Sequence, residues 1–146
     1  MEHITVLLKE AVEGLNVREG GTYIDCTLGG GGHSHRILEL LRGTGRLITI
    51  DQDSYAIERG RARLEGFGNV TFVKDNFENL EAILDSLGIS QADGVLLDLG
   101  VSSFQFDDQD RGFSYWDEAT LDMRMDREAS LDAREVLNTY SLEELN

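Results

Sequence analysis

The chain lacks several features that mark other classes of protein. Its single cysteine, Cys26, excludes an intramolecular disulfide. The sequence has no apolar run of membrane-spanning length and no charged-then-apolar leader. It has no proline, although average usage would give about seven in a chain of this length, and we have no physical account of that absence. Together the first two features predict a cytoplasmic protein that does not cross a membrane.

Cations are scarce, and most of the deficit lies in the second half of the chain. Residues 1–73 contain 8 Lys and Arg against 10 Asp and Glu, whereas residues 74–146 contain 5 against 18, and the formal net charge is −15. Proteins bind a phosphate backbone largely through Lys and Arg, so a field of this sign repels nucleic acid. Charge alone therefore argues against a nucleic-acid binder and favours a solvated acidic surface.

What the sequence does contain is an alternation of short apolar runs with amphipathic segments of helix length. With 146 residues, 40% of them hydrophobic, the chain suffices for one soluble core. Strands are expected at Tyr23–Cys26, Arg46–Ile50, Val70–Val73 and Val95–Leu99, and helices at Ser34–Leu41, Ser54–Leu64 and Phe77–Leu87. This rhythm predicts an α/β fold with an open parallel sheet, in which ligands bind at the carboxyl ends of the strands.

The alternation ends after Leu99, where a long loop rich in aspartate and aromatic residues begins. A further helix is expected from Ser130 or Leu131 to about Tyr140, and Ser141 to Glu144 form a capping box, which marks the start of another helix. Because a helix start without its helix has no use, we expect the chain to be the first part of a longer protein.

The stretch TYIDCTLGGGGHSH, from Thr22 to His35, places four glycines between a strand and a helix. Glycine lets a ligand approach the backbone, at a cost of about 0.5–1 kcal/mol per residue in chain entropy. The helix that follows favours an anionic group at its N-terminus. Asp51 stands 22 residues after Gly29, at a strand end where a carboxylate can accept hydrogen bonds from both ribose hydroxyls. This pairing indicates a nucleoside cofactor.

Two further strand ends narrow the choice of cofactor. Asp75 to Phe77 offer polar groups for the edge of an adenine and a ring for its face, and Asp98 lies at the end of the fourth strand. A dinucleotide would require the G-x-G-x-x-G pattern, whereas the pattern here is D-x-T-x-G-G-G-G. S-adenosylmethionine therefore fits better than NAD, and an NAD-dependent enzyme is kept as a lesser alternative.

Seven segments, in chain order, carry a resemblance to a known family: HITVLLKEAVEGLNV, YIDCTLGGGGHS, LITIDQD, DNF, DGVLLDLGVSSFQFD, DRGFSY and LDMRMD. They resemble the bacterial small-subunit (16S) ribosomal RNA cytosine-N4 methyltransferases of the MraW type, which use S-adenosylmethionine. The resemblance implies a Rossmann-like class I methyltransferase sheet with strand order 3-2-1-4 and helices on both faces. It also implies that residues 1–113 form a partial cofactor-binding core and that residues 114–146 begin an inserted helical domain for substrate recognition.

The resemblance also implies a set of cofactor-binding residues. They are Gly31, Gly32, His33, Asp51, Phe77, Asp98 and Gln105. Phe104 stands where the family usually has proline, so the loop that holds Gln105 has lost a fixed φ. Family members are about twice as long as this chain, and the absent part is the expected place for contacts with small-subunit ribosomal RNA.

The reaction implied is an in-line displacement by the exocyclic amine of cytosine. That amine is a poor nucleophile, so it needs alignment and an acceptor for its proton, for which Asp98 is the catalytic candidate; the alternative is that Asp98 only holds the cofactor. The target base must leave its stack, and Phe113, Tyr115 and Trp116 are candidates to stack on it, with packing as the simpler role.

The alternative function is a non-catalytic S-adenosylmethionine-binding or interaction module. The cysteine and the histidines are also considered as a nucleophile or as metal ligands. Cys26 is interpreted as a small core residue because no neighbour in the sequence would lower its pKa. No histidine pair at i, i+4 spacing and no cysteine partner exists, so no metal is expected. With later strands absent, Val95–Leu99 would be an apolar sheet edge, and we expect a homodimer or a larger assembly through it.

Overall fold

The computed structural model describes residues 7–116 and 118–146. The chain divides into two compact units, residues 1–99 and residues 100–146. Within the described residues no helix is long and apolar enough to cross a membrane. The predicted boundary at residue 113, between a cofactor-binding core and an inserted helical domain, stays a prediction.

The first unit contains a parallel sheet whose strands are β1 (Thr22–Asp25), β2 (Arg46–Asp51), β3 (Val70–Lys74) and β4 (Gly94–Leu96). Their order is β3-β2-β1-β4, which confirms the predicted Rossmann-like sheet. The central pairing sets Ile24 of β1 opposite Ile48 of β2 on one side and Val95 of β4 on the other. The carboxyl ends of β1, β2 and β4 therefore meet at one edge of the sheet.

The fourth strand is shorter than predicted. We expected it to run to Leu99, but β4 ends at Leu96, opposite the last residue of β1. The backbone N–H of Cys26 still donates to the Leu96 carbonyl, at 2.9 Å, before the chain after β1 turns into the glycine loop. Because a strand needs a paired neighbour, the residues after Leu96 leave the sheet although Leu97 and Leu99 are apolar.

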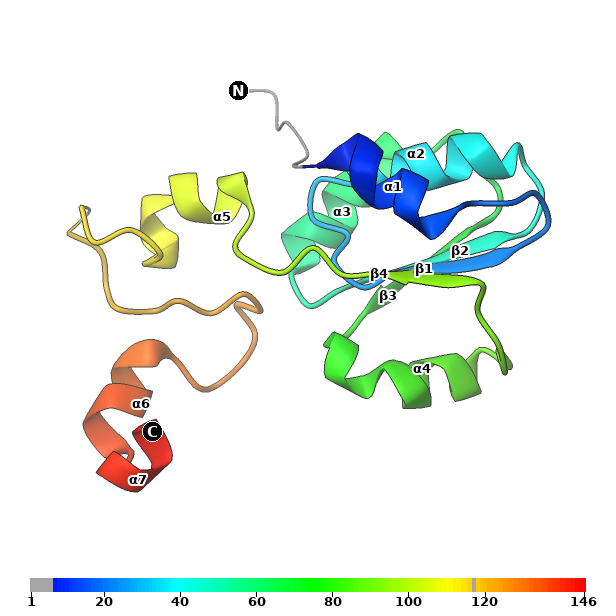
Figure 1. Cartoon of the computed structure of the whole chain (residues 1–146). Helices are drawn as coiled ribbons and strands as arrows, with labels where there is room; N and C mark the ends of the chain where they lie inside the picture. The colour runs from blue at the N-terminus through cyan, green and yellow to red at the C-terminus, as the bar shows by residue number, and fades with distance from the viewer. Residues whose placement is uncertain (1–6, 117) are drawn as a thin grey trace. The chain divides into compact units, whose positions relative to one another are not determined.

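Helices cover both faces of this sheet (Figure 1). On one face lie α1 (Leu8–Leu15), α2 (Gly32–Leu41) and α3 (Ser54–Arg63), and on the other lies α4 (Leu80–Ser86). The predicted helix from Phe77 begins as a 3-10 turn, η1 (Phe77–Asn79), which the Asn76 side chain caps by accepting a hydrogen bond from the N–H of Glu78. The helix α1 was not predicted.

Each face of the sheet has its own hydrophobic core. Tyr23 and Leu47 pack with α1, α2 and α3, whereas the next residues along the strands, Ile24 and Ile48, pack with Ile83 of α4. This alternation follows from the two-residue period of a strand. Both faces are apolar because both are covered, which is why the strands read as short continuous hydrophobic runs.

The second unit consists of short helices and long connections. Its elements are α5 (Ser103–Asp107), η2 (Gln109–Arg111), α6 (Ala133–Thr139) and α7 (Leu142–Leu145). The predicted capping box is confirmed, since the Ser141 hydroxyl accepts from the N–H of Glu144 and the Glu144 carboxylate accepts from the N–H of Ser141. The predicted helix near residue 130 is α6, which Asp132 caps.

One buried cation organises the connection between η2 and α6. Arg111 is 4% exposed, and its Nη2 donates to the carbonyl oxygens of Arg124 and Met125 at 3.1 and 2.9 Å. Arg124 in turn forms an ion pair with Asp122 at 2.7 Å, which lowers the pKa of that carboxyl to about 2. Of the three aromatic residues predicted to stack on a base, Phe113 is partly buried, whereas Tyr115 and Trp116 are 84% and 79% exposed with ring centroids 4.5 Å apart.

A substitution at Gly60 tests how tightly α3 packs against the loop that follows β1. A methyl group at Gly60 would come within 2.6 Å of Leu28 Cδ2, and Leu28 is 2% exposed. We expect Gly60→Ala to lower the free energy of unfolding by about 1–3 kcal/mol through overpacking. Gly14→Ala is the matched control, because α1 leaves open space there, and it should raise stability by about 0.5–1 kcal/mol. Denaturant unfolding measures both; equal effects would contradict the packing.

Candidate functional site

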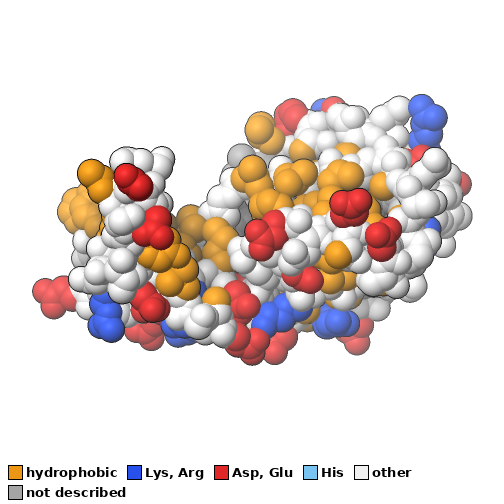
Figure 2. Space-filling model, turned by 90° about the horizontal axis from the view of Figure 1, so that it is seen from below, with side chains coloured by type: hydrophobic (Ala, Val, Ile, Leu, Met, Phe, Trp, Pro, Cys, Tyr) orange, Lys and Arg blue, Asp and Glu red, His pale blue; other side chains and the backbone are white. Residues whose placement is uncertain are grey.

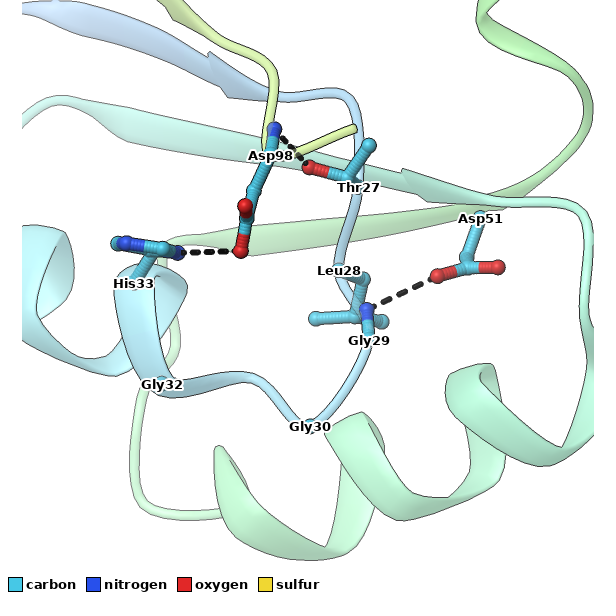
Figure 3. Close-up of a pocket in the computed structure, with 8 residues that line it drawn as sticks. All are labelled: Thr27, Leu28, Gly29, Gly30, Gly32, His33, Asp51 and Asp98. Carbon is cyan, nitrogen blue, oxygen red and sulfur yellow. Dashed lines mark hydrogen bonds and ion pairs between the residues drawn. The ribbon is translucent and has the colours of Figure 1, made fainter. Parts of the chain in front are cut away.

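A pocket opens at the carboxyl ends of β1 and β2, beside the glycine loop (Figure 3). It is lined by Thr27, Leu28, Gly29, Gly30, Gly32, His33, Asp51 and Asp98. Its volume is about 60 Å³, whereas pockets that enclose a drug-sized ligand are typically about 300–1,000 Å³. The pocket therefore holds only part of a nucleoside-sized ligand, and the rest would lie across the neighbouring strand ends.

The glycine loop takes its shape from backbone conformations that other residues rarely adopt. Gly29 and Gly31 have φ angles of 48° and 73°, in the left-handed region. The loop is fixed at both ends: the N–H of Leu28 donates to the Ile50 carbonyl at 3.0 Å, and the N–H of Gly31 donates to the Leu28 carbonyl at 2.7 Å. From α3, Arg63 Nη1 donates to the Gly30 carbonyl at 3.0 Å. The loop is thus held against both β2 and α3.

Asp51 ends β2 and forms one side of the pocket. Its Oδ2 accepts a hydrogen bond from the N–H of Gly29 at 2.9 Å, and its Oδ1 accepts one from the N–H of Asp53 at 2.9 Å. Burial raises the pKa of the Asp51 carboxyl above its ordinary value of 3.8, although these N–H groups act in the opposite direction. The backbone N–H of Gln52 also hydrogen-bonds to this carboxyl. Because a carboxylate can accept about four hydrogen bonds, Asp51 keeps limited capacity for a ligand.

His33 and Asp98 face each other on the opposite side of the pocket (Figure 3). His33 Nδ1 lies 3.8 Å from Asp98 Oδ2, and the His33 side chain is 5% exposed while that of Asp98 is 50% exposed. His33 Nε2 is buried without a hydrogen-bond partner among the described residues. The backbone N–H of Asp98 donates to Thr27 Oγ1 at 2.7 Å. Asp98 therefore presents an accessible carboxylate from a fixed backbone position.

Asp25 lies behind the loop as a fully buried carboxylate that sequence reasoning did not single out. Oδ1 accepts from the N–H of Thr27 at 3.1 Å, and Oδ2 accepts from the Ser34 hydroxyl at 2.6 Å. Burial raises the pKa of the Asp25 carboxyl, against the effect of these hydrogen bonds. The signal available in the sequence was an aspartate inside the apolar run YIDC, since aspartate is almost never fully buried without partners.

The structure brings together some of the predicted site residues. Gly32, His33, Asp51 and Asp98 line one pocket. Gly31 is not a lining residue. It is the N-cap residue of α2, where an added Cβ would lie 3.4 Å from Arg63 Cδ and 3.8 Å from Gly60 Cα. Sequence reasoning missed Thr27, Leu28, Gly29 and Gly30 as lining residues, although they belong to the same quoted stretch.

Besides Gly31, two further predicted residues lie outside the lining of this pocket. Phe77 is 37% exposed and begins η1 just after β3, and β3 is the neighbour of β2, the strand that Asp51 ends. Gln105 belongs to the second unit, where it is 5% exposed and its Oε1 accepts from the N–H of Ser102 at 3.0 Å. That bond completes a capping box at the start of α5. The prediction that Phe77 and Gln105 bind cofactor stays a prediction.

The charge of the pocket is negative. Asp51 and Asp98 line it, Asp25 lies close behind the loop, and none of the described lining residues is Lys or Arg. Among the described residues, no group of three or more His, Cys, Asp or Glu is placed to hold a metal ion. Cys26 is 2% exposed in the core beneath α4, which confirms its interpretation as a core residue, and burial raises the pKa of its thiol to about 11.

Comparison with known proteins identifies the family. Residues 1–146 match the MraW methylase family over their whole length. The chain belongs to this family. It is 53% identical over 144 residues to a ribosomal RNA small subunit methyltransferase H of Clostridium botulinum (strain Kyoto / Type A2), a match that covers 99% of this chain and 47% of the relative. It is 52% identical to ribosomal RNA small subunit methyltransferase H 1 of Acholeplasma laidlawii, covering 99% of this chain and 48% of the relative.

Membership of the MraW family agrees with the likeness of the fold to solved structures. The crystal structure of NSun6 from Pyrococcus horikoshii with SFG superposes with a TM-score of 0.54 at 26% identity, covering 68% of this chain and 24% of that one. The expected methyltransferase fold is therefore confirmed. The chain spans about half the length of the curated relatives that it matches.

The raised pKa of Asp51 predicts a pH dependence of stability. Because the folded state binds the Asp51 proton more tightly than the unfolded state does, this group adds stability that is fully present below pH 3.8 and is lost as pH rises through the raised pKa. Asn cannot titrate. The difference in unfolding free energy, wild type minus Asp51→Asn, should therefore increase as pH falls from 7 towards 4. Denaturant unfolding at several pH values measures it, and a difference that decreases on acidification would contradict the burial of this carboxyl.

Proposed function

We propose that the first unit binds S-adenosylmethionine and that the chain is the cofactor-binding part of an enzyme that methylates the N4 amine of a cytosine in small-subunit ribosomal RNA. The observation that carries this proposal is a negatively charged pocket beside a glycine loop, at the carboxyl ends of the strands, in a member of the MraW methylase family. The relatives' names give the ribosomal RNA substrate class. Because those relatives are about twice as long, the substrate and the activity belong to the whole protein.

The charge of the pocket fits this cofactor better than a phosphate ligand. S-adenosylmethionine carries a positive sulfonium and a positive ammonium group, and both are favoured near Asp51 and Asp98. The phosphates of ATP or NAD would face the same carboxylates without a Lys or Arg among the described lining residues. The acidic lining therefore supports S-adenosylmethionine, the cofactor expected from the glycine pattern, and weighs against an NAD-dependent enzyme.

Individual residues suit separate parts of the cofactor. The N-terminus of α2, at Gly32 and His33, presents free N–H groups suited to the ligand's carboxylate. The remaining acceptor capacity of Asp51 suits the ribose hydroxyls, and the partly exposed ring of Phe77, next to the end of β3, suits an adenine face. Gly31 and Gln105 are kept as proposed cofactor-binding residues on the family resemblance alone.

The chemistry required of the protein is to hold an amine and accept its proton. When bound, S-adenosylmethionine supplies a methyl group on a positively charged sulfur. Asp98 is the proposed proton acceptor, because its carboxylate is half exposed at the pocket while its backbone is fixed by Thr27. The exposed pair Tyr115 and Trp116 offers a surface on which an unstacked base could lie.

The alternative function is a non-catalytic S-adenosylmethionine-binding or interaction module. Binding of the cofactor does not separate the two functions, since both require it. Transfer of a labelled methyl group to small-subunit ribosomal RNA by the longest protein encoded with this chain separates them. Transfer that is lost in Asp98→Asn at saturating S-adenosylmethionine supports the enzyme, and binding by the wild type without any transfer supports the module.

The proposed cofactor site predicts that Asp51→Ala weakens binding of S-adenosylhomocysteine. Loss of charge-assisted hydrogen bonds to two hydroxyls should cost about 1.5–3 kcal/mol, or roughly 10- to 150-fold in affinity. Asp85→Ala is the control, because it removes an exposed carboxylate of α4 on the other side of the sheet. Calorimetric titration should also show weaker binding of ATP and NAD. Equal affinity in wild type and Asp51→Ala would remove Asp51 from the site.

The edge of the sheet predicts self-association, which we propose as a property of this chain. In the described sheet β4 is an edge strand, and Val95 and Leu97 are 41% and 49% exposed. Seen from the α4 side, the surface shows hydrophobic side chains among carboxylates (Figure 2). Two β4 edges could pair antiparallel about a two-fold axis. Light scattering should give a dimer or larger species that grows as salt screens the charge; a monomer mass at low and high salt would contradict this.

A further inference from the structure

The geometry points to Thr27 as a positioning residue that sets the place of Asp98 in the pocket, and this inference rests on the proposed cofactor site. Thr27 lies between β1 and the glycines, and it was not among the predicted cofactor-binding residues. It lines the pocket itself and contacts both Asp25 and Asp98. Its role therefore concerns the pocket as well as the loop.

The segment that carries Asp98 has left the sheet. The strand β4 ends at Leu96, and the next residues on either side of Asp98, Leu97 and Leu99, are 49% and 69% exposed. The hydrogen bond that fixes the Asp98 N–H runs to Thr27 Oγ1 at 2.7 Å. A side-chain acceptor thus replaces the ladder bond that a longer β4 would have supplied.

Thr27 is in turn fixed from behind. Its backbone N–H donates to Asp25 Oδ1 at 3.1 Å, while Asp25 Oδ2 accepts from the Ser34 hydroxyl at 2.6 Å. Ser34 follows His33 in the first turn of α2, and His33 Nδ1 lies 3.8 Å from Asp98 Oδ2. One buried carboxylate therefore fixes Thr27, which bonds to the Asp98 N–H, and Ser34, which follows His33.

A fully buried aspartate at this position opposes stability. Its neighbours in the strand, Ile24 and Cys26, are apolar and equally buried, so an apolar side chain would fit the local pattern. Burying a carboxylate costs free energy unless it is well hydrogen-bonded. The two hydrogen bonds of Asp25 go to the residues that place His33 and Asp98, which is the arrangement expected of a group that serves the pocket.

Thr27→Val and Thr27→Ser separate the hydroxyl from the rest of the side chain. Val keeps the shape and removes Oγ1, whereas Ser keeps an oxygen that can accept from the Asp98 N–H. We expect Thr27→Val to weaken binding of S-adenosylhomocysteine by roughly tenfold and Thr27→Ser by less than about threefold. Thr27→Ala is a second variant without the hydroxyl, should Val perturb folding. Equal affinity in wild type, Val and Ala would overturn the inference.

A double-mutant cycle tests whether Thr27 acts through Asp98. Combined with Asp98→Ala, Thr27→Val should have little further effect on affinity, because the group that it positions is already gone. Combined with Asp51→Ala, on the other side of the pocket, it should weaken binding by the same factor as alone. Additivity with Asp98→Ala would overturn the inference, since Thr27 would then act by another route.

Amide hydrogen exchange without ligand makes the outcome independent of the proposed function. Exchange at the Asp98 amide should be faster in Thr27→Val than in wild type or Thr27→Ser, with the amides of β1 and β2 unchanged. A wild type that does not bind S-adenosylhomocysteine would overturn the proposed function and leave the exchange experiment decisive for the Thr27 contact. Equal Asp98 exchange in all three proteins would overturn the positioning role.

Discussion

Hydrogen bonds from backbone N–H groups to two strand-end carboxylates, one buried and one partly buried, are the interaction on which this site depends. Asp51 accepts from Gly29, and Asp25 accepts from Thr27, so the two strand-end carboxylates hold the beginning of the glycine loop from two sides. A loop of glycines has little conformational preference of its own, because it lacks the Cβ atoms that restrict the backbone. Its shape therefore comes from these acceptors and from Arg63, which bonds to Gly30 from α3.

The same carboxylates cost stability and create the electrostatic character of the pocket. Burial raises the pKa of Asp25 and of Asp51, which means that the folded protein disfavours their charged forms. A core that served only stability would place apolar side chains at such positions, as Ile24 and Ile50 do. Retaining charge beside a loop that admits a ligand is typical of functional sites, where perturbed carboxylates cluster. The proposed positive ligand would offset part of that cost when it binds.

Sequence reasoning located the strands well and their ends less well. The alternation of apolar runs placed β1, β2 and β3 to within one residue at each end, because β1 and β2 are buried on both faces and β3, although only partly buried, keeps the same apolar run. It extended β4 too far, since Leu97 and Leu99 have the right residue type but no partner strand. It omitted α1, although Leu8, Val12 and Leu15 have helical spacing and Val12 is buried in the first core. The family resemblance indicated His33 and Asp98, whereas Thr27 belongs to the quoted pattern D-x-T-x-G-G-G-G but was not predicted to be a site residue.

The sequence by itself determined the fold class, the strand order and the region of the site, because apolar periodicity, the glycine loop and the family motifs are local patterns that can be read along the chain. It also determined the capping box of Ser141 and Glu144, because the two residues lie within one helical turn of each other. Only the tertiary structure decided which strand-end residues share a pocket. Asp98 meets Thr27 across 71 residues of sequence and Asp51 meets Gly29 across 22, and such contacts arise from the pairing of β1 with β2 and β4 rather than from any local preference. For the same reason only the structure showed that Asp25 is fully buried and bonded to two segments, since burial depends on what both faces of the sheet pack against.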